Sequence, residues 1–211
     1  MPVERVNKIL RPSETPASLA HLRDNVPESP NGKESGSFLI EKTCCFTGNR
    51  NIADNEVDAI KAWLDREALR LAGRGIISFW AGGAIGFDTL AAKAVLRLKA
   101  KMPDVQLGLA LPCKNMHERW SESDRQTLLD CINLADRTIY MSEEYFAGCM
   151  HLRNRFLVDN SSACLYYSVC NGGGTAYTVG YAKKQGLQMI SYHDENNNEI
   201  EGQMGLLLSS E

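Results

Sequence analysis

Three short stretches of the sequence carry residues that could hold an anionic ligand. Their glycine, hydroxyl and charged residues are Thr47, Gly48 and Arg50 in the first, Gly82, Gly83, Gly86 and Asp88 in the second, and Gly172, Gly173, Gly174 and Thr175 in the third. A glycine lets backbone N–H groups approach a ligand that a Cβ would exclude, and the N-terminus of a following helix favours negative charge. The three stretches therefore predict a binding site for an anion such as phosphate.

The side chains of these stretches have both a functional and a structural interpretation. Arg50 could bind phosphate with its planar guanidinium, or lie in solvent as a loop arginine. Asp88 could accept a hydrogen bond from a ribose hydroxyl or a base edge, or cap the helix that follows the glycines. The third stretch is the stronger phosphate candidate because a tight turn needs only one glycine, and Thr175 would donate to the phosphate.

A helical stretch further along supplies a second arginine. Arg153 and Arg155 stand two residues apart in a helix whose apolar positions face inward, so only one of them can point toward the site. Trp120 could stack on a base or fill the core. The histidines and cysteines lack the spacing of metal ligands, and no Ser/His/Asp or Cys/His set is evident. We therefore assign no catalytic residue and no metal site.

Alternating strands and helices must position these stretches. Apolar runs predict strands at residues 43–47, 76–81, 106–111, 137–141, 163–168 and 188–192. Helices are expected between them, the first capped by Asp54 or Asn55 and ending at Gly73, and the last opening at Thr175. This alternation predicts an α/β fold: a Rossmann-like, doubly wound, mainly parallel sheet in a three-layer α/β/α arrangement. The loops after the strands would then meet at one edge of the sheet.

Composition favours one globular domain with an extension at each end. The chain has 211 residues, of which 44% are apolar and 23% charged, which suffices for one sizeable core. Residues 1–36 hold five of the seven prolines and are expected to form a poorly ordered N-terminal arm or linker. Residues 37–195 would form the Rossmann-like domain and residues 196–211 a polar tail. The arm could alternatively dock on a second subunit, which leaves a homo-oligomer open.

Charge and cysteine usage bear on partners and location. The net charge is −3 and the isoelectric point is about 5.9, with no run of lysine or arginine, so nucleic acid is not expected as the main partner. Seven cysteines, an odd number without a CxxC pair, favour a reducing cytoplasm over a disulfide framework. No apolar segment approaches a membrane span, so we expect a cytoplasmic protein without a membrane partner.

Five motifs together resemble the YpsA-like branch of the SLOG superfamily. They are Thr47-Gly-Asn-Arg50, Gly82-Gly-Ala-Ile-Gly-Phe-Asp88, Tyr145 with Cys149-Met-His-Leu-Arg-Asn154, Val158-Asp159 and Gly172-Gly-Gly-Thr175, and the resemblance covers about residues 43–192. The superfamily is Rossmann-like and also contains the LOG phosphoribohydrolases, often labelled lysine decarboxylases, and the DNA-processing protein DprA. The resemblance implies a pocket for a nucleotide or a nucleotide-derived, ADP-ribose-like ligand, with Arg153 and Asn154 among the binding residues and no cofactor required.

The chain departs from the LOG pattern where the chemistry would take place. LOG enzymes carry PGGxGTxxE, whose glutamate serves ribose cleavage together with an arginine. Asn171 stands here where the proline pattern begins, and Thr178 stands where the glutamate would be. Asp88 or Asp159 could supply a carboxylate from another loop. We therefore expect ligand binding or sensing, with a nucleotide N-glycosidase or phosphoribohydrolase as one alternative and single-stranded DNA binding, as in DprA, as another.

Overall fold

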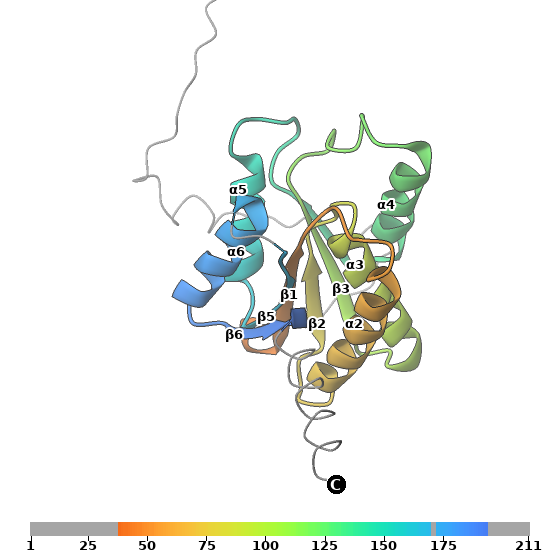
Figure 1. Cartoon of the computed structure of the whole chain (residues 1–211), viewed down its shortest axis with the longest axis vertical. Helices are drawn as coiled ribbons and strands as arrows, with labels where there is room; N and C mark the ends of the chain where they lie inside the picture. Colours follow the sequence, from red (N-terminus) through yellow and green to blue (C-terminus); the bar gives the residue numbers. More distant parts are fainter. Residues whose placement is uncertain (1–37, 170–171, 194–211) are drawn as a thin grey trace, which may run out of the picture.

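The computed structural model describes residues 38–169 and 172–193 (Figure 1). The expected arm at residues 1–36 and the expected tail at residues 196–211 lie outside the described residues, as do Cys170 and Asn171. Within the described part, no helix combines the length and the apolar character that crossing a membrane requires.

Six strands form one parallel sheet. They are β1 (Thr43–Gly48), β2 (Ser78–Ala81), β3 (Gln106–Leu111), β4 (Arg137–Tyr140), β5 (Ala163–Tyr167) and β6 (Gln188–Ser191), in the order β4-β3-β2-β1-β5-β6. Every neighbouring pair is parallel; Cys45 of β1, for example, lies between Trp80 of β2 and Cys164 of β5. The strand order reverses between β1 and β5, which is the position where doubly wound sheets bind ligands.

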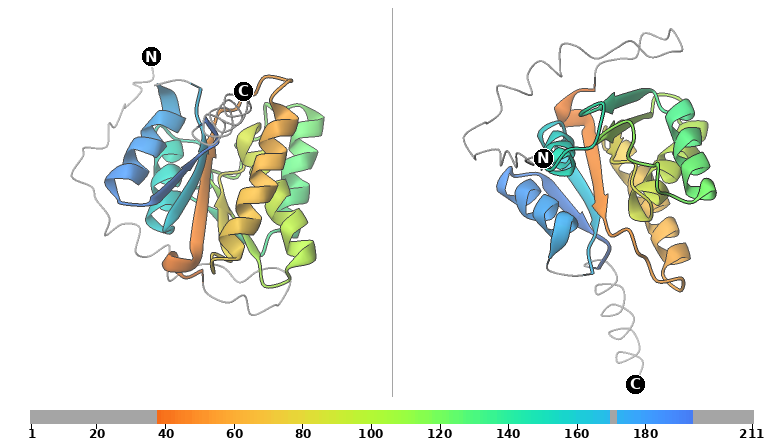
Figure 2. Two further views of the ribbon diagram at one scale, coloured as in Figure 1. Left: turned by 60° about the horizontal axis from the view of Figure 1, so that its bottom comes forward. Right: turned by 90° about the horizontal axis from the view of Figure 1, so that it is seen from above.

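In the described part of the chain, five helices cover the two faces of this sheet. They are α2 (Val57–Ala72), α3 (Phe87–Lys101), α4 (Glu122–Leu134), α5 (Cys149–Asp159) and α6 (Gly173–Lys184), and a short 3-10 helix, η1 (Ile40–Lys42), precedes β1. Figure 2 shows α2, α3 and α4 on one face and α5 and α6 on the other. The expected Rossmann-like α/β/α fold is thereby confirmed.

The hydrophobic core consists of two buried clusters, one on each side of the sheet. The larger joins β1, β2 and β3 to α2 and α3 and includes Trp63, while the smaller lies under α5 and α6 and includes Phe156. Residues 43–47 of β1 are all buried, as expected of a strand that helices cover on both faces. Trp63 is a packing residue, and the partly buried Trp120 also packs against the larger cluster.

The prediction that Asp54 or Asn55 caps α2 is wrong. Glu56, and neither Asp54 nor Asn55, occupies the N-cap position of α2, and its side chain makes no capping hydrogen bond. The Glu56 carboxylate instead accepts a hydrogen bond of 2.8 Å from the Tyr167 hydroxyl of β5. Burial and this hydrogen bond raise the pKa of Tyr167.

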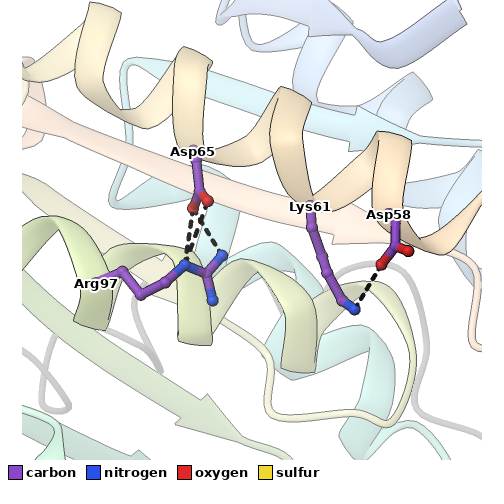
Figure 3. Close-up of polar contacts among 4 residues, drawn as sticks. All are labelled: Asp58, Lys61, Asp65 and Arg97. Atoms are coloured by element: carbon purple, nitrogen blue, oxygen red, sulfur yellow. Dashed lines mark hydrogen bonds and ion pairs between the residues drawn. The ribbon is translucent and has the colours of Figure 1, made fainter.

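Two exposed ion pairs lie on α2 and α3 (Figure 3). Arg97 of α3 donates to Asp65 of α2, with 2.7 Å between Nη2 and Oδ1, and Lys61 pairs with Asp58 on the same helix. The Arg97 and Asp65 side chains are 45% and 47% exposed, so this pair contributes little to stability, at most about 1 kcal/mol.

Candidate functional site

The loops after β1, β2 and β5 meet at Asn49. The Asn49 N–H donates to the Tyr167 carbonyl at 3.2 Å, and the Asn49 carbonyl accepts from the Phe87 N–H at 3.2 Å. The Asn49 side-chain oxygen accepts from the Val169 N–H at 3.1 Å. One residue therefore joins three loops that are far apart in the sequence. Asn49 was not among the predicted site residues, although an asparagine in the loop after the first strand is a signal for a turn held by its side chain.

A buried ion pair lies beside this junction. The Arg153 Nη1 of α5 donates to the Asp88 Oδ2 of α3 at 3.1 Å, and the Ala84 N–H donates to the same oxygen at 3.3 Å. Arg153 and Asp88 are only 7% and 5% exposed. Burial raises the pKa of Asp88, while the nearby charges of Arg153 and Arg50 oppose that rise. Opposite charges from two helices thus meet at the second glycine stretch.

Asp88 does not cap α3, which was one of its two expected roles. Gly86 occupies the N-cap position with a φ of 80°, and no side chain caps this helix. Asp88 is the second residue of α3, and its carboxylate holds the glycine turn through Ala84 and meets Arg153. The Asp88 carboxylate therefore lies on the side of the glycine turn that faces Arg153.

The glycines after β1 and β2 each have a packing reason within the protein. A Cβ at Gly48 would overlap the Phe87 ring, and a Cβ at Gly82 would overlap the Arg153 guanidinium. A Cβ at Gly86 would overlap the Arg50 backbone, and one at Gly83 would overlap Leu111; both of these glycines also have a positive φ. These glycines are required for packing whether or not a ligand binds.

The glycines at the start of α6 are different, because the space beside them is open. Among the described residues, a Cβ at Gly172 or Gly173 would meet no atom within 4 Å, and one at Gly174 would meet only the Asn154 Nδ2 at 4.0 Å. Gly173 has a φ of 82° and needs to be glycine, but Gly172 is extended and Gly174 has no positive φ. Packing therefore does not explain why positions 172 and 174 lack side chains.

The first turn of α6 holds no acidic side chain that could take the position of an anion. Its N-cap residue is Gly172, which provides no side-chain capping hydrogen bond, although capping side chains and acidic residues are common at helix N-termini. The helix begins at Gly173, two residues before the expected start at Thr175, which is half-buried in the first turn. Thr178, at the position of the LOG glutamate, donates its hydroxyl to the Gly174 carbonyl at 2.8 Å.

The two arginines of α5 have different environments. Arg153 is buried, and its Nε has no hydrogen-bond partner among the residues that the structure describes, which is costly for a charged donor. Arg155 is exposed, and its Nε donates to the Tyr177 hydroxyl at 2.9 Å. Asn154 is buried next to Gly174, whereas Arg50 is exposed near the start of the loop between β1 and α2. Arg153 is thus the arginine of this helix that lies at the glycine turns.

Asp159, the other suggested carboxylate, lies away from the glycine loops. It is the last residue of α5 and accepts a hydrogen bond of 2.8 Å from the Tyr181 hydroxyl of α6. A helix rises 1.5 Å per residue, so α5 places Asp159 about 15 Å from its N-terminus. Asp88 is therefore the carboxylate that remains at the site. Among the described residues, no three His, Cys, Asp or Glu side chains gather as a metal site.

The fold and these glycine turns define a Rossmann-like protein of the SLOG type. The chain belongs to the YpsA family: residues 47–195 match its family model, described as the YspA SLOG family. A UPF0398 protein of Enterococcus faecalis is 27% identical over 176 residues, which cover 76% of this chain and 98% of that protein. A UPF0398 protein of Halalkalibacterium halodurans is 26% identical over 159 residues, covering 67% and 84%. The uncharacterized prophage-derived YoqJ of Bacillus subtilis is 29% identical over 137 residues, covering 58% and 80%.

Two solved structures of DNA processing protein A share the fold. DprA from Streptococcus pneumoniae has a TM-score of 0.56 at 12% identity, covering 83% of this chain and 65% of that chain. DprA from Helicobacter pylori, whose structure concerns a single-stranded DNA binding mode, has a TM-score of 0.53 at 18% identity, covering 71% and 64%. This chain therefore matches just under two thirds of each DprA chain, and the likeness shows the fold.

Proposed function

We propose that this protein binds a phosphorylated, nucleotide-like ligand at the carboxyl edge of its sheet. The observation that carries the proposal is the open space that the described residues leave beside Gly172 and Gly174, at the start of α6. The N-terminal N–H groups of a helix, together with its dipole, form a binding site for phosphate. The absent side chains at these positions leave room for that group.

The Asp88–Arg153 pair would bind the polar part of the ligand. The unpartnered Arg153 Nε is a buried donor that a ligand oxygen could satisfy. Both hydrogen bonds to Asp88 from the described residues fall on Oδ2, so Oδ1 is the oxygen that would accept from a ribose hydroxyl. Arg50, exposed and close enough to lower the pKa of Asp88, would add positive charge near the phosphate.

The same geometry favours binding over cleavage of the ligand. The position of the LOG glutamate carries Thr178, whose hydroxyl is engaged by the helix backbone. Asp88 is held by Arg153 and Ala84, and Asp159 lies at the far end of α5. A phosphoribohydrolase or N-glycosidase would therefore need Asp88 to act as its only carboxylate.

Incubation with AMP, followed by chromatography for free adenine, tests this enzymatic alternative. Release of adenine that is abolished in Asp88→Asn would support it.

A matched pair of glycine substitutions tests the binding proposal. Gly174 and Gly180 both lie in α6 with no close contact for a Cβ, so alanine at either position should keep or raise stability, by up to about 1 kcal/mol. Isothermal titration of AMP, ADP-ribose and inorganic phosphate should show binding to the wild type and to Gly180→Ala. Affinity should fall at least about tenfold in Gly174→Ala because the methyl group enters the phosphate position.

Two results would contradict the proposal. If no phosphorylated compound binds to the folded wild type, the glycine turn at α6 has no such ligand. If Gly174→Ala binds as tightly as Gly180→Ala, the phosphate does not lie at the start of α6.

Single-stranded DNA, an alternative that the sequence left open although nucleic acid was not expected as the main partner, is the second candidate ligand. The fold likeness to DprA and the outer side of α5 and α6 favour it. There Arg155 contacts the Tyr177 hydroxyl and lies 5.9 Å from the centroid of the Tyr181 ring. The last turn of α6 adds the basic residues Lys183 and Lys184. Aromatic and basic side chains together are typical of such surfaces. Binding of a labelled oligothymidine that weakens steeply from 50 to 200 mM salt and is lost in Arg155→Ala would support this candidate.

A further inference from the structure

Two neighbouring aromatic side chains are exposed in the segment between β4 and α5. Tyr145 is 63% exposed and Phe146 is 37% exposed. The other large apolar side chains that the described residues expose are aliphatic, and most of them lie on η1, α2 and α4, namely Leu39, Ile40, Leu69, Leu129 and Leu134. Contiguous exposed apolar side chains mark ligand-binding or partner-binding surfaces, whereas singly exposed ones need no explanation.

This segment is fixed in position by the segment that follows β3. The Tyr145 N–H donates to the Asn115 side-chain oxygen at 3.1 Å, and the Lys114 N–H donates to the Glu143 carbonyl at 3.1 Å. The Ser142 hydroxyl donates to the Pro112 carbonyl at 3.1 Å. The backbone that carries Tyr145 is therefore anchored, so the ring can be presented at little cost in conformational entropy.

The other end of the segment leads directly into the helix that supplies Arg153. The Phe146 carbonyl accepts from the Cys149 N–H at 3.1 Å, and Gly148, with a φ of 109°, turns the chain into α5. Arg153 follows Cys149 by four residues, about 6 Å along the helix. Figure 1 shows this segment rising beside α5 above the ends of the strands.

We propose that Tyr145, with Phe146 beside it, is a stacking platform for the aromatic base of the ligand. This inference rests on the proposed function, and it assigns the base of the ligand to the segment between β4 and α5. The segment that carries the two rings leads into α5, the helix whose Arg153 pairs with Asp88. The base of a ligand whose ribose meets Asp88 would lie toward this segment. Stacking on an aromatic ring tolerates different bases because each base has a π-face, so the platform selects nucleotides over sugar phosphates.

Paired ligands separate the platform from the phosphate site. AMP and ribose 5-phosphate would be titrated into the wild type, Tyr145→Ala, Tyr145→Phe and Leu134→Ala. Leu134 is 58% exposed at the end of α4 and is the matched control for losing an exposed side chain. We expect Tyr145→Ala to weaken AMP binding about tenfold or more and to leave ribose 5-phosphate unchanged. Tyr145→Phe and Leu134→Ala should bind both compounds as the wild type does.

The outcomes that overturn the platform differ from those that overturn the proposed function. Wild-type protein that binds AMP no more tightly than ribose 5-phosphate, or Tyr145→Ala that weakens both equally, removes the platform but keeps the phosphate site. Wild-type protein that binds neither compound removes the proposed function, and the platform with it.

Discussion

The guanidinium of Arg153 occupies the space that a side chain at Gly82 would fill. Arg153 comes from α5, on one face of the sheet, and reaches its ion-pair partner Asp88 on α3, on the other face. The missing side chain at position 82 is what allows this contact at the carboxyl edge. The glycine turn after β2 therefore serves a buried ion pair.

Alanine at position 82 should break this arrangement. The new methyl group would displace the Arg153 guanidinium and separate it from Asp88, and losing one side of a buried ion pair costs about 3 kcal/mol or more. Urea denaturation of Gly82→Ala should show this loss in the free energy of unfolding. Gly180→Ala, where the methyl group meets no atom within 4 Å, is the control. Equal stability of the two variants would refute the packing role of Gly82.

Removing the arginine should make stability depend on pH. In Arg153→Met, Asp88 stays buried without its main opposite charge, so its pKa rises further. The folded state then keeps a proton that the unfolded state releases above about pH 4, so the free energy of unfolding falls as pH rises through that range. We expect little loss relative to the wild type at pH 4 and a loss of about 3 kcal/mol at pH 7.

Arg97→Met is the control for this prediction because it breaks the exposed pair with Asp65. Its cost should stay below about 1 kcal/mol at both pH values. Denaturation curves at pH 4, 5.5 and 7 measure both variants. An Arg153→Met loss of the same size at pH 4 and pH 7 would show that the ionisation of Asp88 is not its cause.

Tyr181 should contribute stability that is lost in alkaline solution. Burial and its hydrogen bond to Asp159 raise the pKa of Tyr181 to about 12, above the value of about 10 for an unfolded chain. The folded state therefore holds this proton more tightly, and stability declines as pH rises from about 10 to 12. Tyr181→Phe should decline less over that range, and Asp159→Asn should lower the pKa seen in titration of tyrosine absorbance.

The cysteines should be unreactive until the protein unfolds. Six of the seven cysteines lie in the described residues, and all six are buried. Burial raises the pKa of Cys44, and a hydrogen bond with Cys45 together with burial raises that of Cys164, which disfavours the reactive thiolate. In Cys170→Ser, Ellman's reagent should modify six thiols after denaturation and react slowly with the native protein. Rapid reaction of even one thiol in the native variant would contradict this.

Local sequence patterns were sufficient to predict the strands and helices of the fold. The strand predicted at residues 106–111 is β3 (Gln106–Leu111), because an apolar run that ends at Pro112 leaves little choice. Alternation of apolar strands and helices also predicted the parallel sheet, since strands that helices cover on both faces read as continuous apolar runs.

The contacts of the site depended on residues far apart in the sequence. An aspartate at the start of a helix is expected to cap that helix. Asp88 instead pairs with Arg153, which lies 65 residues away in the sequence. Glu56 is likewise engaged by Tyr167, which lies 111 residues further along. The position of Asp159 could have been predicted from the sequence. Asp159 is the last residue of a helix that begins at the carboxyl edge of the sheet, so it lies toward the opposite edge.

The two groups of glycines should have different evolutionary fates. Gly82 and Gly86 leave no room for a Cβ against atoms of the protein, so they should persist in any descendant that keeps this fold. Gly172 and Gly174 meet no such obstacle, and selection would preserve them only while a ligand needs the space. A relative that retains the first group and carries larger residues in place of the second would be a folded protein that has lost or exchanged its ligand.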